Sequence, residues 1–203
     1  MKKYFMEQGS SEWHHIRKGK ITGTVLKGIM GTPKARKTAL YEVLAERLTV
    51  GVDMEYENAI ERGLRLESDA VASFELEKDK KVELTGFCED DTNPFIANSP
   101  DGLIGETEGV EVKCMGGTNH IKMWLENKVP DEYEWQVVQY FIVNEKLQKL
   151  YFVGYNPDIP IKTLIILEVN RETIEEDIKN AKVAQEIFLG EVEKLLQDLI
   201  PEL

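Results

Sequence analysis

The chain has 203 residues, 42% of them hydrophobic and 31% charged, with a formal net charge of −12, and this is enough apolar material for one domain with its own core. No apolar run reaches the roughly 18 residues that a membrane span needs, and the N-terminus does not resemble a signal peptide, so we expect neither. The two cysteines, Cys88 and Cys114, are too few for an iron–sulfur cluster, and we expect them to be packed thiols of a cytosolic protein.

The charge is distributed unevenly along the chain. Residues 1–50 contain ten Lys and Arg against four Asp and Glu, a net charge of +6, whereas residues 51–203 contain 15 against 33, a net charge of −18. A basic segment on an acidic body can form a cationic path for a phosphodiester backbone. The same residues can also be no more than a solvated surface.

The first 50 residues are predicted to be mainly helical. Ser10 is a capping residue for a short amphipathic helix that Gly19 ends, and Thr22 can cap a second helix over residues 23–30. Apolar residues at helical spacing predict a third helix over residues 38–48.

The middle of the chain alternates between helical and strand patterns. We expect an irregular loop over residues 50–56 and then a long helix over residues 58–80, which contains many acidic residues. Strands are predicted over residues 82–87 and 95–97.

The stretch that follows predicts a β-hairpin. A Gly-Glu-Thr-Glu-Gly turn at residues 105–109 separates an apolar segment from the alternating strand 110–114. Residues i and i+2 of a strand project from the same face, so Glu111 and Lys113 stand side by side while the apolar residues between them face the other way. The fold-back of the hairpin can also bring the carboxylate of Asp101 near Glu111.

This arrangement points to a cation site. Two carboxylates that converge beside an ammonium group repel one another unless a divalent cation lies between the acids, and hard oxygen ligands of this kind suit magnesium or manganese. The alternative is a surface hairpin whose Glu-Lys pair is solvated and whose Pro-Asp-Gly is only a turn.

The last third of the chain returns to alternating helices and strands. Helices are predicted over residues 118–126 and 132–144, and strands over residues 150–155 and 163–169. A long, acidic, amphipathic helix follows over residues 171–199, which we expect either to cover one face of the sheet or to contribute to a subunit interface.

Three motifs, taken together, resemble a known family. Pro100-Asp101, nine intervening residues and Glu111-Val112-Lys113 resemble the Pro-Asp…Asp/Glu-x-Lys signature of the superfamily that includes type II restriction enzymes. Two further runs are similar to motifs of phage lambda exonuclease and related viral alkaline exonucleases. They are Trp13-x-x-x-Arg17-x-Gly19-x-Ile21-Thr22-Gly23-Thr24 and Glu61-Arg62-Gly63-x-x-Leu66-Glu67-x-x-Ala70.

The resemblance implies a fold and a domain organisation. The expected fold is an α/β restriction-endonuclease-like core, with a central mixed β-sheet flanked by α-helices. We expect a single nuclease domain over residues 1–203. It comprises a basic N-terminal helical part (1–50), a catalytic core (51–170) and a C-terminal helix (171–203).

The resemblance also implies an activity. The family consists of metal-dependent 5′-to-3′ exodeoxyribonucleases, which degrade one strand of linear double-stranded DNA and leave 3′ overhangs for recombination by single-strand annealing. The implied cofactor is Mg²⁺ or Mn²⁺, with two ions per active site. The implied partners are double-stranded DNA ends, further copies of the chain in a homotrimer, and a single-strand annealing protein. No membrane is involved, and the implied location is the cytoplasm of the host cell if the chain is phage-encoded.

Roles in catalysis follow from the same resemblance. The metals would be bound by Asp101 and Glu111, helped by Glu67 and by the backbone carbonyl of Val112. Lys113 would orient the attacking water or stabilise charge in the transition state.

A glutamine is also implied to point into the active site, and Gln139 falls where the family carries it. The usual Gln-x-Gln spacing is Gln-x-x-Gln in this chain, which leaves Gln136 as the rival.

The family further implies a site for the recessed 5′ phosphate. Its residues here are Arg17, Thr24 and Ser99, with Thr22 beside them; Thr24 stands where the family usually has Ser and retains the hydroxyl. A planar guanidinium and the free N–H groups at a helix start are suited to a phosphate.

Two other functions compete with this interpretation. One is a structure- or site-specific endonuclease on the same fold, which would cut a covalently closed plasmid. The other is a non-catalytic DNA-binding assembly protein, against which the presence of Asp101, Glu111 and Lys113 argues.

Overall fold

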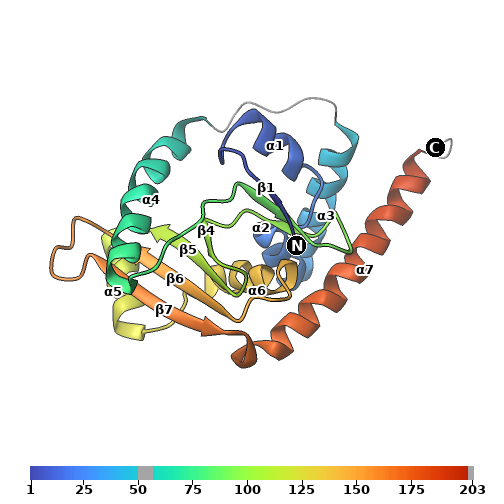
Figure 1. The fold of residues 1–203 in the computed structure, drawn as a ribbon. Coiled ribbons are helices and arrows are strands. Elements are labelled where there is room, and N and C mark those ends of the chain that lie inside the picture. The colour runs from blue at the N-terminus through green and yellow to red at the C-terminus, as the bar shows by residue number, and fades with distance from the viewer. Residues whose placement is uncertain (50–56, 201–203) are drawn as a thin grey trace.

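The structure is a computed structural model that describes residues 1–49 and 57–200, with the backbone alone for residues 57–65. The loop predicted over residues 50–56 lies outside the described residues. Within them, the chain forms a four-stranded sheet and a smaller three-stranded sheet, with helices packed around both (Figure 1).

The larger sheet is mixed, as the resemblance implied. Its strand order is β4 (Gly102–Ile104), β5 (Glu108–Cys114), β6 (Lys149–Tyr155) and β7 (Leu164–Asn170). Only β5 and β6 are parallel to each other. The predicted hairpin is therefore present as β4 and β5, with β5 paired along its whole length.

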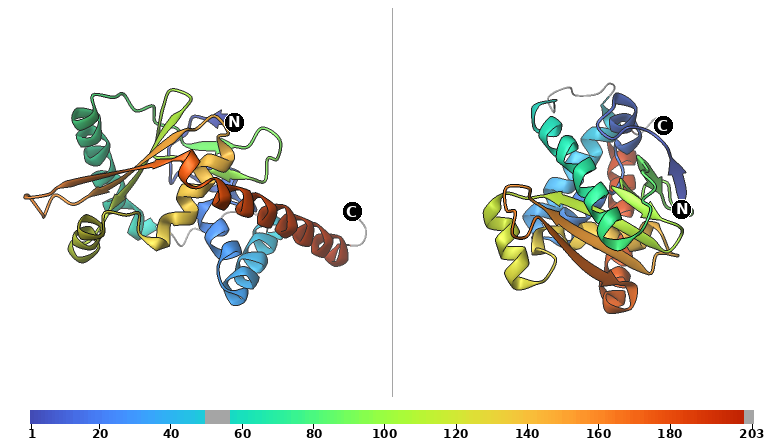
Figure 2. Two further views of the ribbon diagram at one scale, coloured as in Figure 1. Left: turned by 90° about the horizontal axis from the view of Figure 1, so that it is seen from below. Right: turned by 60° about the vertical axis from the view of Figure 1, so that its left-hand side comes forward.

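Helices cover both faces of this sheet (Figure 1, Figure 2). Alternate residues of β6 point to opposite sides, so that Phe152 joins the core that contains α6 (Glu134–Val143), and Val153 packs with Ala70 of α4 (Glu57–Lys78). Because both faces are buried, β6 is an almost continuous apolar run rather than an alternating one.

The smaller sheet was not expected from the sequence. It is antiparallel and consists of β1 (Lys2–Tyr4), β2 (Phe87–Glu89) and β3 (Ala97–Asn98). The prediction of a strand over residues 82–87 is wrong. Among residues 82–86 only Glu83 takes part in strand pairing, through an isolated bridge to Leu103, and β2 begins at Phe87. The backbone turns through Gly86 instead, packed against the segment that follows β1.

Each of the three N-terminal helices begins directly after a serine or threonine at its N-cap. They are α1 (Ser11–Arg17), α2 (Gly23–Met30) and α3 (Pro33–Leu48). The Ser10 side chain accepts the Trp13 N–H, as predicted. The third helix starts earlier than expected, because Thr32 caps it and proline is tolerated in the first helical turn.

Two of the later helices are preceded by a short 3₁₀ turn. Helix α5 runs from Gly117 to Glu126, and a 3₁₀ turn at Asp131–Tyr133 precedes α6, which starts two residues later than predicted. A second 3₁₀ turn at Arg171–Thr173 precedes α7 (Glu175–Leu199). None of the described helices is long and apolar enough to cross a membrane.

The C-terminal helix does not lie on the sheet. Helix α7 packs chiefly against α2, α3 and α6, and its distal part extends beyond the body of the molecule (Figure 2). Its buried residues include Phe188 and Val192, which belong to the core shared with those helices. The expectation that it covers a sheet face is wrong, because α6 already occupies the face of the sheet on this side.

Two glycines give a matched test of this packing. A Cβ added at Gly86 would lie 2.2 Å from the carbonyl oxygen of Met6, whereas a Cβ at Gly190, within α7, meets nothing within 4 Å. We predict that Gly86→Ala lowers the free energy of unfolding by about 1–3 kcal/mol and that Gly190→Ala raises it by up to about 1 kcal/mol. Urea denaturation with unchanged m-values measures both; effects of the same sign would contradict the packing.

Candidate active site

The hairpin brings Asp101 beside the strand that carries Glu111. Asp101 lies immediately before β4, and its Oδ2 accepts the backbone N–H of Val112 at 2.7 Å. This bond lies just beyond the last β4–β5 pair, which joins Gly102 to Val110. The side chain of Asp101 is therefore held at the level of Glu111 and Lys113 by the backbone itself.

The Glu111 carboxylate is held from two sides. It is only 5% exposed, one oxygen lies 2.5 Å from the Nζ of Lys113, and the other accepts the hydroxyl of Tyr140 at 2.5 Å. The Lys113 ammonium also lies 5.3 Å from the centre of the Tyr133 ring. Glu111 and Lys113 thus share the face of β5 that α6 covers, while Val110 and Val112 pack on the α4 side.

Tyr140 connects the two acids, and the sequence analysis missed it. Its hydroxyl accepts the backbone N–H of Asp101 at 3.1 Å and lies within hydrogen-bond distance of both the Val110 carbonyl and Glu111. The spacing of Tyr133, Gln136 and Tyr140 places these residues on one face of a helix. Side chains with polar groups at that spacing are the signal that could have identified this face.

Negative charge exceeds positive charge at this site. Burial, together with the nearby Glu111 and Glu67 carboxylates, holds the pKa of Asp101 well above its usual value. Burial and Glu111 likewise raise the pKa of Glu67. Burial disfavours the Lys113 ammonium, but Glu111 and Asp101 outweigh it and raise the pKa of Lys113. One ammonium therefore faces three carboxylates.

The donor set fits a hard divalent cation. The carboxylates of Asp101, Glu111 and Glu67 supply oxygen ligands of the kind that Mg²⁺ and Mn²⁺ prefer, and a cation would offset the repulsion that raises the pKa values of Asp101 and Glu67. Among the described side chains, no three acidic, His or Cys groups already form a ready-made cage. Glu111 is instead engaged by Lys113 and Tyr140.

A second group of predicted residues meets beside the first. Arg17, at the end of α1, donates a 2.6 Å hydrogen bond to the Ser99 hydroxyl and stacks on the Trp13 ring at 3.9 Å. Burial lowers the pKa of Arg17 to about 10, an effect that Glu46 partly opposes. Since Ser99 is two residues before Asp101, this guanidinium is tied to the strand entry that carries the carboxylate.

The start of α2 lies against the site face of α6. A Cβ at Gly23 would lie 2.9 Å from the Cα of Gln136, so the first turn of α2 is adjacent to that residue. Thr24 is exposed there, and the buried Thr22 makes no capping hydrogen bond with its side chain. The Thr22 side chain therefore does not occupy the N–H groups in the first turn of α2.

The side chain of Gln139 does not point toward the carboxylates. It is fully buried, donates to the carbonyls of Ile21 at 2.9 Å and Ala97 at 3.0 Å, and accepts a 2.6 Å bond from Gln185. The expectation that Gln139 enters the active site is corrected by these bonds, because they use its amide to join α6 to the segment before α2 and to α7. Gln136, one helical turn from Tyr140, is the glutamine on the site face.

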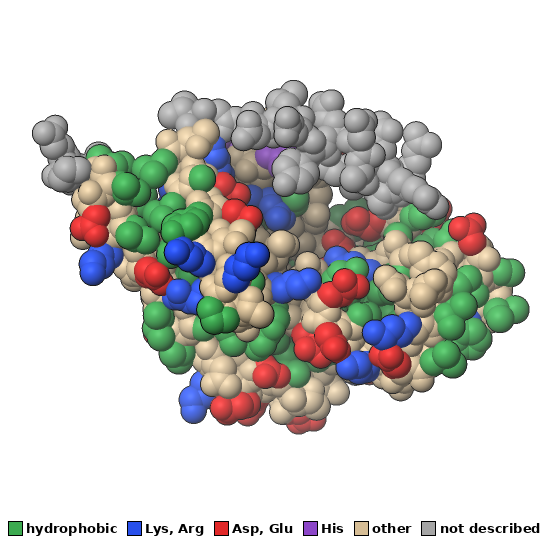
Figure 3. Space-filling model, turned by 180° about the vertical axis from the view of Figure 1, so that it is seen from behind, with side chains coloured by type: hydrophobic (Ala, Val, Ile, Leu, Met, Phe, Trp, Pro, Cys, Tyr) green, Lys and Arg blue, Asp and Glu red, His purple; other side chains and the backbone are tan. Residues whose placement is uncertain are grey.

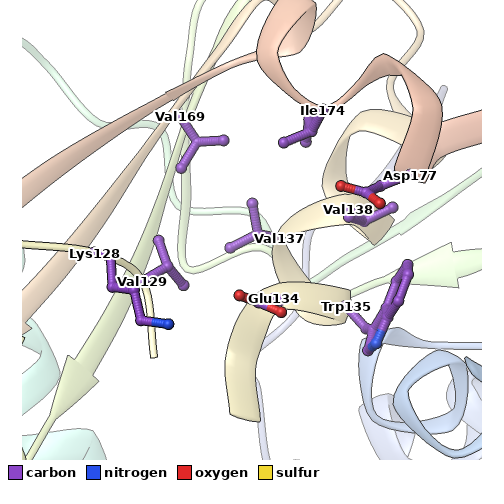
Figure 4. A pocket seen from close by; sticks show the side chains of 9 residues that line it. All are labelled: Lys128, Val129, Glu134, Trp135, Val137, Val138, Val169, Ile174 and Asp177. Atoms are coloured by element: carbon purple, nitrogen blue, oxygen red, sulfur yellow. The ribbon is translucent and has the colours of Figure 1, made fainter. Parts of the chain in front are cut away.

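The opposite side of α6 lines a pocket of about 240 Å³ (Figure 4). Successive helical residues turn by about 100°, so Val138 lies on the side of α6 away from Tyr140, whereas Val137, three residues before Tyr140, lies between the two sides. Lys128, Val169 and Asp177 complete the wall from other segments. This pocket is distinct from the carboxylate site.

The basic N-terminal segment is partly neutralised within the fold. Lys20 pairs with the buried Glu89 at 2.8 Å, and Arg36 pairs with Glu191 of α7 at 2.7 Å. On the face drawn in Figure 3, Lys and Arg side chains lie among Asp and Glu side chains rather than in one uninterrupted track.

The role of the Tyr140 hydroxyl can be tested by removing it. We predict that Tyr140→Phe lowers the free energy of unfolding by about 1–3 kcal/mol, because the Asp101 N–H loses its acceptor. Tyr41→Phe is the control, since Tyr41 is 56% exposed and its hydroxyl is open to water. Urea denaturation measures both, and a Tyr140→Phe protein as stable as the wild type would contradict the network.

Comparison with known proteins places this geometry in a family. Residues 12–146 match the profile of the YqaJ-like viral recombinase domain. The alkaline exonuclease LHK-Exo of Laribacter hongkongensis, in complex with dAMP, is 27% identical with a TM-score of 0.86, over 95% of this chain and 97% of that one. A second LHK-Exo structure gives 26% and 0.80, over 95% and 99%.

A phage-related exonuclease from Haemophilus somnus 129PT shares the fold alone, at 16% identity and a TM-score of 0.60, over 89% of this chain and 96% of that one. No curated protein matches the chain significantly. The expected nuclease-type α/β fold is confirmed by these likenesses. The family match spans well over half of the residues of this chain. The chain therefore belongs to the YqaJ-like viral recombinase domain family.

Proposed function

We propose that this protein is a metal-dependent exodeoxyribonuclease that degrades one strand of linear double-stranded DNA from its 5′ end and leaves a 3′ overhang. The observation that carries the proposal is the meeting of Asp101, Glu111 and Lys113 at the end of the hairpin, with Arg17 and Ser99 joined beside it. The similar LHK-Exo is named an alkaline exonuclease, and its complex with dAMP is compatible with a site for one terminal nucleotide.

Hydrolysis of the phosphodiester is assigned to the carboxylate site. Asp101, Glu111 and Glu67, with the backbone carbonyl of Val112, would hold Mg²⁺ or Mn²⁺, two ions per active site. Such ions supply an activated water and neutralise charge on the phosphate oxygens. Lys113, beside Glu111, orients the attacking water or stabilises the charge that develops in the transition state.

The direction of digestion is assigned to the second group of residues. The Arg17 guanidinium, the Ser99 hydroxyl and the exposed Thr24 at the start of α2 bind the terminal 5′ phosphate, with Thr22 beside them. A guanidinium makes forked contacts to phosphate oxygens, and free N–H groups at a helix start favour an anion. Holding the end fixes which phosphodiester reaches the carboxylates.

The biological setting follows from the family resemblance. We propose that the chain acts on double-stranded DNA ends in the cytoplasm as a homo-oligomer, a trimer by that resemblance. A single-strand annealing protein would then use the 3′ overhang for recombination.

Digestion of linear duplexes labelled at either end, beside a covalently closed plasmid, tests the activity and its polarity. We predict faster digestion from 5′-phosphorylated than from 5′-hydroxyl ends and an intact closed plasmid. Arg17→Met is expected to bring the two linear rates together, whereas the control Lys27→Met, an exposed cation on α2, leaves their ratio unchanged. Cutting of the closed plasmid would favour the endonuclease, and binding without cleavage of any substrate would favour the non-catalytic protein.

Metal dependence has a test in stability as well as in activity. Because the raised pKa of Asp101 disfavours its ionised form in the fold, the metal-free protein loses stability as the pH rises from 3.8, the ordinary value, through the raised pKa. We predict that Asp101→Asn in EDTA at pH 8 unfolds at the same or a higher temperature than the wild type.

Addition of Mg²⁺ or Mn²⁺ should raise the unfolding temperature of the wild type but hardly that of Asp101→Asn. The variant should also lose nuclease activity by a factor of at least about 10². Equal metal-induced shifts in the two proteins, or full wild-type activity in EDTA, would contradict the cation site.

A further inference from the structure

The loop that joins α1 to α2 is held by hydrogen bonds with side chains in the last turn of α3. Gly19, two residues after Arg17, donates its N–H to the Glu46 carboxylate at 2.7 Å. Its carbonyl accepts the Nε–H of Arg47 at 2.9 Å. Two consecutive side chains of α3 therefore hold both backbone polar groups of a single loop residue.

The contact between this loop and Arg47 requires glycine. Gly19 has a φ of +70°, and a Cβ at this position would lie 2.5 Å from the Cγ of Arg47. A residue without a side chain is needed both for the left-handed backbone and for the close approach. The position of the Arg47 side chain therefore depends on a glycine at residue 19.

Arg47 also reaches the segment that leads to Ser99. Its guanidinium lies 3.9 Å from the centre of the Phe95 ring, and the Phe95 carbonyl accepts the N–H of Ile21 at 2.7 Å. Ala97 donates to the carbonyl of Ile21 at 3.0 Å. One guanidinium therefore braces the two segments that carry Arg17 and Ser99.

A simple tie between α3 and α7 does not account for this arrangement. Arg47 lies 3.6 Å from Glu193, but its side chain is only 11% exposed and its Nη2 is buried without a hydrogen-bond partner in the described part of the chain. Burying an unpaired donor of a charged group is costly. Arg36 ties the same two helices at the surface, by its 2.7 Å pair with Glu191 and a 31% exposed side chain.

We propose that Arg47 and Glu46 are positioning residues for the 5′-phosphate site. By fixing Gly19 they set the position of Arg17 relative to the start of α2 and to Ser99. Glu46 also counteracts the effect of burial on the Arg17 guanidinium. The proposal rests on the proposed function, and neither residue touches the reacting atoms.

Arg36→Met is a matched control for Arg47→Met. Both changes remove a cation from α3 and an ion pair with α7, but only Arg47 holds the loop. The readout is the affinity of a short duplex with a 5′ phosphate divided by that of the same duplex with a 5′ hydroxyl, measured by fluorescence anisotropy in EDTA so that nothing is cleaved. KM and kcat on 5′-phosphorylated linear duplex are measured in Mg²⁺.

We expect Arg47→Met to reduce the affinity ratio by about tenfold or more, since small displacements of binding groups have large effects, and to raise KM more than it lowers kcat. Arg36→Met should leave the ratio at the wild-type value. Glu46→Gln, which keeps an acceptor for the Gly19 N–H, should preserve most of the ratio, whereas Glu46→Leu should lose it. If Arg47→Met does not fold, Glu46→Leu and Glu46→Gln decide the question in the same way.

The outcomes separate this inference from the proposed function. If Arg17→Met abolishes the preference for a 5′ phosphate but Arg47→Met and Glu46→Leu retain it, the positioning role is overturned and the phosphate site stands. If Arg47→Met and Arg36→Met change the affinity ratio equally, Arg47 is only a packing residue, and the positioning role is overturned in this case too. If the wild type does not distinguish the two ends, the phosphate site is wrong and the positioning role falls with it.

Discussion

The structure depends on how it holds a largely buried glutamate next to other acids. Glu111 is kept from water by the sheet and α6, and its two oxygens are engaged by Lys113 and Tyr140. Asp101 is brought to the same place by a backbone hydrogen bond from β5, although the negative charge around it raises its pKa. The proposed cation site rests on this arrangement, in which buried carboxylates lie close enough to raise the pKa of Asp101.

The rest of the fold fixes which way β5 faces. Val110 and Val112 pack against Ala70 and Phe74 of α4, and a shift of one residue in register would turn them to the other face. Their burial is therefore what directs Glu111 toward α6. The parallel pairing of β5 with β6 along all of its residues makes such a shift still less favourable.

The two proposed sites are connected by short stretches of backbone. Ser99 bonds to Arg17 and lies two residues before Asp101. The site face of α6 carries both Tyr140, beside the acids, and Gln136, beside the start of α2. A phosphate held at one site therefore lies at a defined position relative to the other, which is what removal of nucleotides from an end requires.

The sequence predicted the local parts of this arrangement well, because they depend on residues near one another in the chain. The hairpin, the shared face of Glu111 and Lys113, and the Ser10 cap follow from alternation, turn residues and capping. The rotation of α6 does not follow from periodicity, since Gln136 and Gln139 both lie in a helix that is buried on several sides.

The remaining misses have the same physical cause. The small sheet is built from strands of two or three residues, and its strand β1 pairs with β2 across more than 80 positions of the chain. The contacts of Arg47 with Gly19 likewise join segments that no local pattern relates. Family resemblance selected Glu67 from a helix with many acids, and the pKa shifts it shares with Asp101 are a property of the folded chain alone.

In the proposed reaction, the ammonium group of Lys113 works with the carboxylates of Asp101 and Glu111 on one phosphodiester. The most direct measurement compares purified Lys113→Met with the wild type on linear 5′-phosphorylated duplex in Mg²⁺, after both are shown to be folded and to bind the duplex. We predict that Lys113→Met loses turnover by a factor of at least about 10². Turnover at the wild-type rate would contradict it.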